Sequence, residues 1–404
     1  MPQLLDRPAG DAGSRQIPAG GPGPVRVLLL NHATGMAGAE RSLLDIVTQL
    51  DPGRFAFTVA LPEARSRLGE RLKAVGAEVF AAPLRRFKKT LSLWTLVRYA
   101  VNLRRVARQL RGEIARRGIA LVHANSNSAQ LYGGLAARQA GIPSIWHCRD
   151  LVALGPLGPW MFRRCARCIA ISDCVADHLS AYAPPPGRLV RIYNGIAAEP
   201  APTDAAGETL RAEFGFAADA FVFAIVGQLV PWKKHALFLE AAARIHRQVP
   251  RARFLVLGDD LFADHPGYRN ELEYLSSRLG IRQHVVFAGY REDVPRVLRA
   301  TDALLHCASR EPFGRAIAEA MGAGLPVVAV NACGPRELIR DGVDGLLVPP
   351  DDPDAMAGAA VRLARDPSLA PALGAAARRR IAQGFSLRAF SDRLTALYEE
   401  VLCG

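Results

Sequence analysis

Residues 311–352 read EPFGRAIAEAMGAGLPVVAVNACGPRELIRDGVDGLLVPPDD, and they give the clearest indication of how the chain folds. Pro312 and Gly314 make a tight turn with few side chains, and the small residues after it predict a helix over about 315–323. The apolar run 326–330 then predicts a buried strand. A helix followed by a buried strand is the repeating unit of a doubly wound parallel sheet.

The start of this predicted helix has the chemistry of an anion site. Backbone N–H groups around Phe313 and Arg315 have no acceptor inside the helix, and the helix dipole favours a negative charge beside them. Glu311 and Glu319 frame the same turn with carboxylates that can accept bonds from sugar hydroxyls. The stretch therefore indicates a nucleotide-diphosphate pocket. The alternative is an ordinary helix whose acids are solvated surface charges.

Two glutamates separated by seven residues and followed by such a strand resemble the signature of glycosyltransferase family 4, a group of retaining enzymes. The resemblance implies the GT-B fold, in which two Rossmann-like domains face each other across a cleft. It implies that Glu319 holds the ribose of the nucleotide and that Glu311 contacts the donor sugar. It also implies that the backbone from Phe313 through Gly314 meets the phosphates.

Alternating strand and helix patterns run through most of the chain and predict two α/β domains. Length alone favours two domains over one, since single cores rarely exceed about 300 residues. A Pro/Ala/acid segment at 199–209 predicts the linker between them. The expected division is a disordered tail, an acceptor-binding domain, a nucleotide-sugar domain and a helix that crosses back, at residues 1–24, 25–199, 200–385 and 386–404.

Two places in the first half are predicted to line a ligand cleft. Gly38 lies in a glycine-rich turn after the strand VRVLLLN, and the resemblance implies that this turn faces the acceptor and the donor phosphate. His147, Arg149 and Asp150 end a strand at 144–150, where ligands of doubly wound sheets bind. The resemblance implies a histidine near the transferred sugar, matched here by His147. A structural, hydrogen-bonded histidine is the alternative.

The sequence GQLVPWKK departs from the family in one position. The family has an arginine after the glycine and a lysine five residues later, which together neutralise the leaving diphosphate. This chain keeps Gly227 and Lys233 but has Gln228 in place of the arginine. A glutamine donates hydrogen bonds but carries no charge. The difference predicts weakened catalysis, or compensation by Arg315 or Lys234.

Positive charge is confined to the first half of the chain. Residues 1–200 hold 27 Lys and Arg against 13 Asp and Glu, whereas the rest holds 24 against 25. Much of the excess falls in residues 85–117, where arginines alternate with Trp94, Tyr99 and leucines. That composition is typical of a helix at an anionic membrane surface, and also of a crossover helix packed on a sheet. We expect no nucleic-acid partner.

Seven scattered cysteines favour reduced thiols, since an odd number in a large chain makes a poor disulfide framework. Cys165, Cys168, Cys174 and His178 have passable zinc spacing, but their apolar neighbours favour inert buried thiols. No apolar run approaches the roughly 20 residues of a membrane span. We expect a cytoplasmic protein, free or peripheral at the inner membrane face, with no metal and no cofactor.

The sequence thus predicts a retaining transferase that moves a hexosyl group from a nucleotide sugar to a hydroxyl of a glycan, a lipid-linked or a small-molecule acceptor. A nucleotide-sugar-binding protein without activity is the alternative, favoured by Gln228. A nicotinamide dehydrogenase would need G-x-G-x-x-G after the first strand, and GMAGAE does not supply it. Nucleic-acid binding rests on charge alone, without a recognised module.

Overall fold

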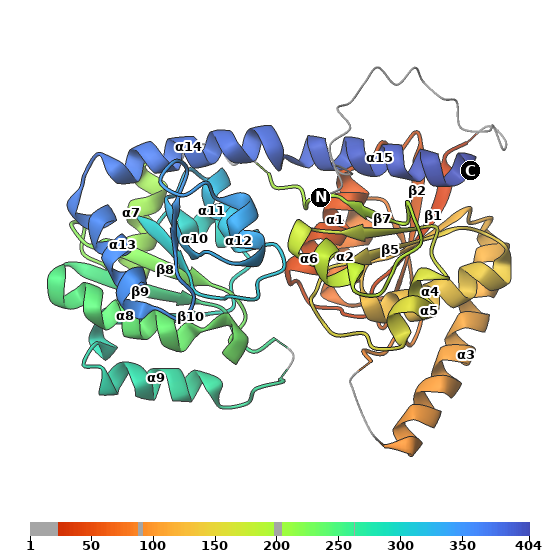
Figure 1. The fold of residues 1–404 in the computed structure, drawn as a ribbon, viewed down its shortest axis with the longest axis horizontal. Helices are drawn as coiled ribbons and strands as arrows, with labels where there is room; N and C mark the ends of the chain where they lie inside the picture. The colour runs from red at the N-terminus through yellow and green to blue at the C-terminus, as the bar shows by residue number, and fades with distance from the viewer. Residues whose placement is uncertain (1–22, 88–91, 198–203, 262) are drawn as a thin grey trace. The chain divides into compact units, whose positions relative to one another are not determined.

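The computed structural model describes residues 23–87, 92–197, 204–261 and 263–404 (Figure 1). The chain divides into two compact units. The first runs to Gly195 and includes Leu387–Gly404, and the second is Ile196–Ser386. The expected tail lies almost entirely outside the described residues.

The first unit alternates strands and helices almost throughout. Its elements are β1 Val25–Leu30, α1 Gly38–Gln49, β2 Phe55–Leu61, α2 Arg67–Ala74, β3 Glu78–Ala81, α3 Leu93–Arg117, β4 Leu121–Ala124, α4 Asn127–Ala140, β5 Ser144–Cys148, α5 Leu157–Phe162, β6 Arg167–Ala170, α6 Asp173–Ser180, β7 Leu189–Arg191 and the C-terminal α15 Leu387–Cys403.

The second unit repeats this alternation. Its elements are α7 Asp204–Glu213, β8 Phe221–Val226, the 3-10 turn η1 Pro231–Lys233, α8 His235–Gln248, β9 Ala252–Leu257, α9 Tyr268–Arg278, η2 Arg282–His284, β10 Val285–Gly289, α10 Val294–Leu298, β11 Ala303–His306, α11 Arg315–Gly322, β12 Val327–Val330, α12 Cys333–Leu338, β13 Leu346–Val348, α13 Pro353–Arg365 and α14 Leu369–Gly384.

Both sheets are parallel and share one strand order. The first runs β3-β2-β1-β4-β5-β6-β7 and the second β10-β9-β8-β11-β12-β13. In each sheet the order reverses beside the first strand, between β1 and β4 and between β8 and β11. Ligands of doubly wound sheets bind beyond the carboxyl ends of the strands at such reversals. The predicted fold of two Rossmann-like domains is confirmed.

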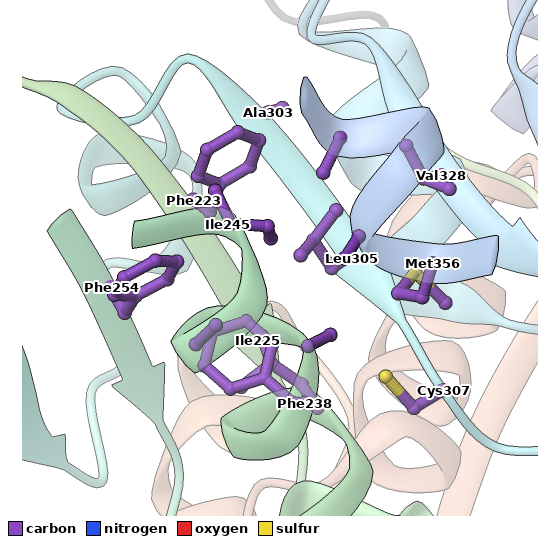
Figure 2. Close-up of a cluster of buried hydrophobic side chains, with 14 of the residues drawn as sticks. Phe223, Ile225, Phe238, Ile245, Phe254, Ala303, Leu305, Cys307, Val328 and Met356 are labelled. Carbon is purple, nitrogen blue, oxygen red and sulfur yellow. The ribbon is translucent and has the colours of Figure 1, made fainter. Parts of the chain in front are cut away.

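Helices cover both faces of each sheet, so the strands read as continuous apolar runs. In the second unit, Phe223 and Phe254 stack between neighbouring strands with ring centroids 6.0 Å apart. Phe238 of α8 meets Phe254 edge-on, and Met356 of α13 belongs to the same cluster (Figure 2). This rigid core holds the strand ends that carry the polar loops.

Helix α4 begins at Asn127, where Ser126 caps it by accepting a bond from the Ala129 N–H. One predicted boundary is wrong. The expected linker 199–209 is helical from Asp204 onward, since α7 starts there. Alanines and an acid near the start of that segment favour a helix over an extended linker.

Candidate functional site

The loop after β8 carries Lys233 to the strand reversal of the second unit. Its first residue, Gly227, donates its N–H to the Leu257 carbonyl at 2.9 Å. Gly258 follows β9 with φ +149°, and a Cβ on it would lie 1.8 Å from the Gly227 carbonyl oxygen. Only a glycine permits this backbone contact. The contact fixes the start of the loop that ends in η1, where Lys233 lies.

The neighbouring loop, after β11, places Glu311 beside Lys233. The Gly334 N–H donates to the Glu311 carbonyl at 3.0 Å, and a Cβ on Gly334 would lie 2.3 Å from the Phe313 carbonyl oxygen. Phe313 itself is buried. The turn predicted at Pro312 and Gly314 therefore packs directly against the start of α12, where Gly334 lies.

Lys233, Glu311 and His306 form a cluster in which Glu311 and His306 are buried and Lys233 is half-buried. The Lys233 Nζ contacts Glu311 Oε2, and His306 Nε2 lies 3.2 Å from the same oxygen. Burial would raise the pKa of Glu311, but the Lys233 ammonium and the His306 hydrogen bond outweigh it and hold that pKa well below its usual range. The carboxylate is ionised and Lys233 is a fixed cation. An anionic ligand that binds Lys233 would take the place of the Glu311 carboxylate as the partner of the ammonium group.

The helix that follows has the predicted anion-binding geometry. Gly314 takes φ +96° and precedes α11, whose first N–H groups have no intrahelical acceptor. Arg315 Nε donates to Glu319 Oε1 at 2.7 Å, one turn apart on the helix. The structure therefore brings Gly314, Arg315 and Glu319 together, and pairs the two charged side chains with each other.

Gln228 lies in the loop after β8, which also carries Lys233. It is half-buried and occupies the position at which the family has a cation. Its carbonyl accepts a bond from the Val230 N–H at 2.9 Å, which tightens the turn. Lys234, the proposed substitute, pairs with Asp351 at 2.8 Å and is itself part-exposed. Compensation by Lys234 would require that pair to open.

In the first unit, amide side chains organise the strand ends at the reversal between β1 and β4. Asn31 Nδ2 donates to Glu40 Oε1 at 3.0 Å, and Asn125 Nδ2 donates to the Ala39 carbonyl at 3.0 Å. These bonds hold the start of α1, whose first residue, Gly38, is exposed. The sequence reasoning missed Asn31 and Asn125 as site residues.

Arg149 joins this amide cluster from the end of β5. Its Nε donates to Asn125 Oδ1 at 2.9 Å and its Nη1 to Asn194 Oδ1 at 2.7 Å. Its Nη2 lies 3.1 Å from His147 Nδ1. Asn194 follows β7, and no sequence pattern described above gives this asparagine a role. The guanidinium thus gathers polar groups from several strand ends.

His147, by contrast, is fully buried and makes no contact with solvent. Its pKa is lowered well below its ordinary value by burial, and further by Arg149 and His123. The ring is therefore neutral. The contact of His147 with a sugar stays a prediction. Its buried, hydrogen-bonded ring fits the alternative of a structural histidine.

Two buried histidines predict acid sensitivity. Burial, aided by a neighbouring cation, lowers the pKa of His123 and of His235 to about 3. The unfolded chain takes up these protons near pH 6.5 while the folded chain does not, so stability falls as pH drops below 6.5. Each histidine contributes up to about 1.4 kcal/mol per pH unit. Urea unfolding from pH 7 to pH 4.5 should show this slope, and a flat midpoint would contradict it.

Among the described residues, no group of histidine, cysteine and acidic side chains has the arrangement of a metal site. Cys165 and Cys168 are buried free thiols, and burial raises the pKa of Cys165 to about 12. His178 Nε2 instead lies 3.1 Å from the Val152 carbonyl. The zinc alternative finds no support in this geometry.

Comparisons with known proteins agree with the two-unit division. The model of glycosyltransferase family 4 matches residues 36–199, and that of glycosyl transferases group 1 matches residues 207–380. The UDP-Gal:alpha-D-GlcNAc-diphosphoundecaprenol alpha-1,3-galactosyltransferase of Escherichia coli is 27% identical over 301 residues, 70% of this chain and 76% of the relative. The alpha-D-kanosaminyltransferase of Streptomyces kanamyceticus is 28% identical over 318 residues, 73% and 80%.

Solved structures share the fold at lower identity. Anabaena HepE, in complex with UDP and glucose, superposes with a TM-score of 0.80 at 24% identity, covering 93% of this chain and 99% of that one. The two parallel sheets and these matches define a glycosyltransferase of the GT-B fold. Within that class, the chain belongs to the group 1 glycosyltransferases, with a family 4 domain in its first half.

Proposed function

We propose that this enzyme transfers a hexosyl group from a nucleoside-diphosphate sugar to an acceptor hydroxyl with retention of the anomeric configuration. The observation that carries the proposal is the cluster of Lys233, Glu311 and His306 beside the start of α11. It supplies a fixed cation and backbone N–H groups for a diphosphate, with a carboxylate next to them for the sugar.

In this proposal the leaving diphosphate is stabilised by Lys233 and by the N–H groups after Gly314, and such electrostatic stabilisation is usually the largest catalytic term. The departing phosphate oxygen takes the proton of the attacking hydroxyl on the same face of the sugar. Glu311 then orients the sugar hydroxyls and acts as neither nucleophile nor base. Gly38, His147 and Arg149 belong to the acceptor side, and the chemistry uses no metal.

UDP is the proposed nucleotide. The Escherichia coli relative is named for UDP-Gal, and HepE structures contain UDP or UDP-glucose. The same relative is named for a diphosphoundecaprenol acceptor, which supports a lipid-linked acceptor here. Such an acceptor would bring the enzyme to the inner face of a membrane.

The product itself tests the reaction. Incubation with UDP-glucose, UDP-galactose or UDP-N-acetylhexosamines and a lipid-diphosphate sugar acceptor should yield a glycoside with the anomeric configuration of the donor, read by proton NMR. Addition of EDTA should leave the rate unchanged. An inverted product, or loss of activity restored by Mn²⁺, would overturn the mechanism.

Substitution of Glu319 tests the ribose contact. Hydrogen bonds to a carboxylate contribute about 1.5–3 kcal/mol, so Glu319→Ala should raise the Kd of UDP about 10-fold to 100-fold. Glu273→Ala is a matched control, because it breaks a similar one-turn pair with Arg269 on α9. Calorimetric titration measures both. An unchanged Kd for Glu319→Ala would remove it from the nucleotide site.

We propose that helix α3 binds an anionic membrane surface. Val106, Leu110 and Ile114 pack its C-terminal half into the unit, whereas Leu93 is 76% and Trp94 is 70% exposed near its start. Leu96, Val97 and Val101 are also exposed, as are Arg98, Arg104, Arg105, Arg108 and Arg111. Residues 88–91 lie outside the described part. Apolar side chains and cations together fit an anionic bilayer surface. No helix in the described part of the chain is long and apolar enough to span a bilayer.

Binding to vesicles tests this surface. The protein should bind phosphatidylglycerol-containing vesicles and be released by salt, and Trp94→Glu with Val101→Glu should weaken binding at least about tenfold through lost apolar burial. Tyr274→Glu, which alters a 67% exposed aromatic on α9, is the control and should bind as before. Equal binding of all three proteins would rule out α3 as the contact.

The alternative function is nucleotide-sugar binding without transfer. Gln228 favours it, because one of the two cations of the family is missing. Binding of UDP with no turnover of any UDP-sugar would select that alternative.

A further inference from the structure

A chain of buried hydrogen bonds crosses the first unit from its C-terminal helix to its strand ends. Tyr398 Oη lies 2.7 Å from His123 Nδ1, and His123 Nε2 lies 3.1 Å from His147 Nδ1. Arg149 Nη2 lies 3.1 Å from the same His147 Nδ1. The three ring side chains are fully buried.

Arg149, the last member of this hydrogen-bond chain, sets the direction of every hydrogen bond in it. A guanidinium has donors only, so His147 Nδ1 must accept and the ring proton lies on Nε2. The same Nδ1 can only accept from His123, whose Nε2 therefore carries a proton. His123 Nδ1 is then an acceptor, and the Tyr398 hydroxyl donates to it. The contact with Arg149 therefore fixes the tautomers of both His147 and His123.

Burial and charge keep this arrangement in place. The pKa of His123 is lowered to about 3 and that of His147 is also lowered, in each case by burial first and Arg149 second. A second proton on His147 would place an N–H against the guanidinium. Both rings are consequently neutral across the physiological pH range.

The other end of this hydrogen-bond chain, the Tyr398 hydroxyl, is held in place by contacts of α15. The Tyr398 ring meets Phe55 edge-on, with centroids 5.4 Å apart. Next to it, Glu399 pairs with Arg54 and Glu400 pairs with Arg167. The hydroxyl is thus held rigidly over the sheet, although it lies 275 residues from His123 in the sequence.

His147 Nε2 is buried and has no hydrogen-bond partner among the residues that the structure describes. A buried N–H without an acceptor is costly. Because Nε2 carries the proton, the ring offers a donor here and no lone pair.

We propose that Tyr398 and His123 are positioning residues for the transfer reaction: they hold the His147 ring as a neutral Nε2–H donor and keep Arg149 at the amide cluster of the strand ends. The inference rests on the proposed function, in which His147 and Arg149 serve the acceptor side. It adds the C-terminal helix to the support of that site. It also means that His147 does not accept the proton of the attacking hydroxyl.

Nitrogen-15 NMR of histidine-labelled full-length protein tests the hydrogen-bond chain, with His147→Gln used to assign the His147 signals. We expect a protonated Nε2 and an unprotonated Nδ1 on His147 from pH 6 to pH 8. A protonated Nδ1, or a titration in that range, would overturn the inference.

Steady-state kinetics test the positioning role. Tyr398→Phe keeps the ring but leaves His123 Nδ1 without its donor, so kcat should fall roughly fivefold to tenfold with little change in the KM of the donor. The His147 signals should shift in the same variant. Tyr182→Phe is the control, since it also loses one hydroxyl contact, to the Leu154 N–H, away from this chain. It should keep the wild-type kcat and His147 spectrum.

The outcomes separate the two proposals. A wild-type enzyme that transfers sugar, with a folded Tyr398→Phe variant of unchanged kcat, overturns the positioning role alone. A folded wild-type protein that transfers no sugar overturns the proposed function, and the positioning role with it, whatever the spectrum shows.

Discussion

Replacing Lys233 with alanine is expected to lower kcat by roughly 100-fold to 1,000-fold, the cost of losing one group that stabilises developing charge in a transition state. Lys233 is the cation that contacts Glu311 at the strand reversal, and Gln228 supplies no second charge in its loop. The leaving diphosphate would therefore lose its main side-chain counterion. Single-turnover rates at saturating UDP-sugar measure the effect on the chemical step.

A slow Lys233→Ala variant must be distinguished from a misfolded one. Lys233→Ala leaves a buried carboxylate without its ammonium partner, which is itself destabilising. The double variant Lys233→Ala with Glu311→Gln removes that orphaned charge and should fold normally while remaining slow. Lys234→Asn is the matched control, because its ammonium pairs with Asp351 and asparagine tolerates the left-handed backbone there. Equal losses in Lys233→Ala and Lys234→Asn would contradict a specific role for Lys233.

Gly258→Ala is expected to destabilise the second unit by about 3 kcal/mol or more, the sum of backbone strain and overpacking. The new Cβ would lie 1.8 Å from the Gly227 carbonyl oxygen at a φ of +149°. A shift of Gly227 away from the new Cβ would strain the hydrogen bond from its N–H to the Leu257 carbonyl. Chemical unfolding, followed by UDP binding at low temperature, measures both the stability and the shape of the Lys233 loop.

The same change from glycine to alanine is expected to stabilise the protein at Gly358. It lies inside α13 with an ordinary helical φ, and no atom beyond its own helix turn lies within 4 Å of the position that an added methyl group would take. Gly358→Ala should raise stability by about 0.5–1 kcal/mol through helix propensity. If Gly258→Ala were as stable as wild type, the close approach of the two loops would be wrong.

Much of the donor side could be predicted from local sequence. The turn at Gly314, the helix after it and the charged pair of Glu311 and Glu319 are consecutive in the chain, so their geometry follows from turn and helix rules. The strands predicted at 25–31, 144–150 and 326–330 also lie close to β1, β5 and β12. The pattern of buried strands alternating with helices is strong enough to specify a doubly wound fold.

The remaining site residues depend on contacts that no local pattern specifies. His306 is only 5 residues from Glu311, yet nothing in β11 itself indicates that its ring contacts the carboxylate. Asn125 and Asn194 meet at Arg149 through the order of the strands. His123, which contacts His147, likewise meets the Tyr398 hydroxyl from far away in the sequence. Periodicity and motif spacing carry no information on such pairings.

The most direct measurement is a thermal-shift titration of the wild-type protein with UDP, GDP, ADP and dTDP, each with and without Mg²⁺. A ligand that binds only the folded state raises the melting temperature according to its concentration and affinity. The proposed donor site predicts a saturable rise with UDP that needs no metal and is lost in Glu319→Ala. No shift with any nucleoside diphosphate, from a well-folded sample, would contradict the account of this enzyme as a nucleotide-sugar transferase.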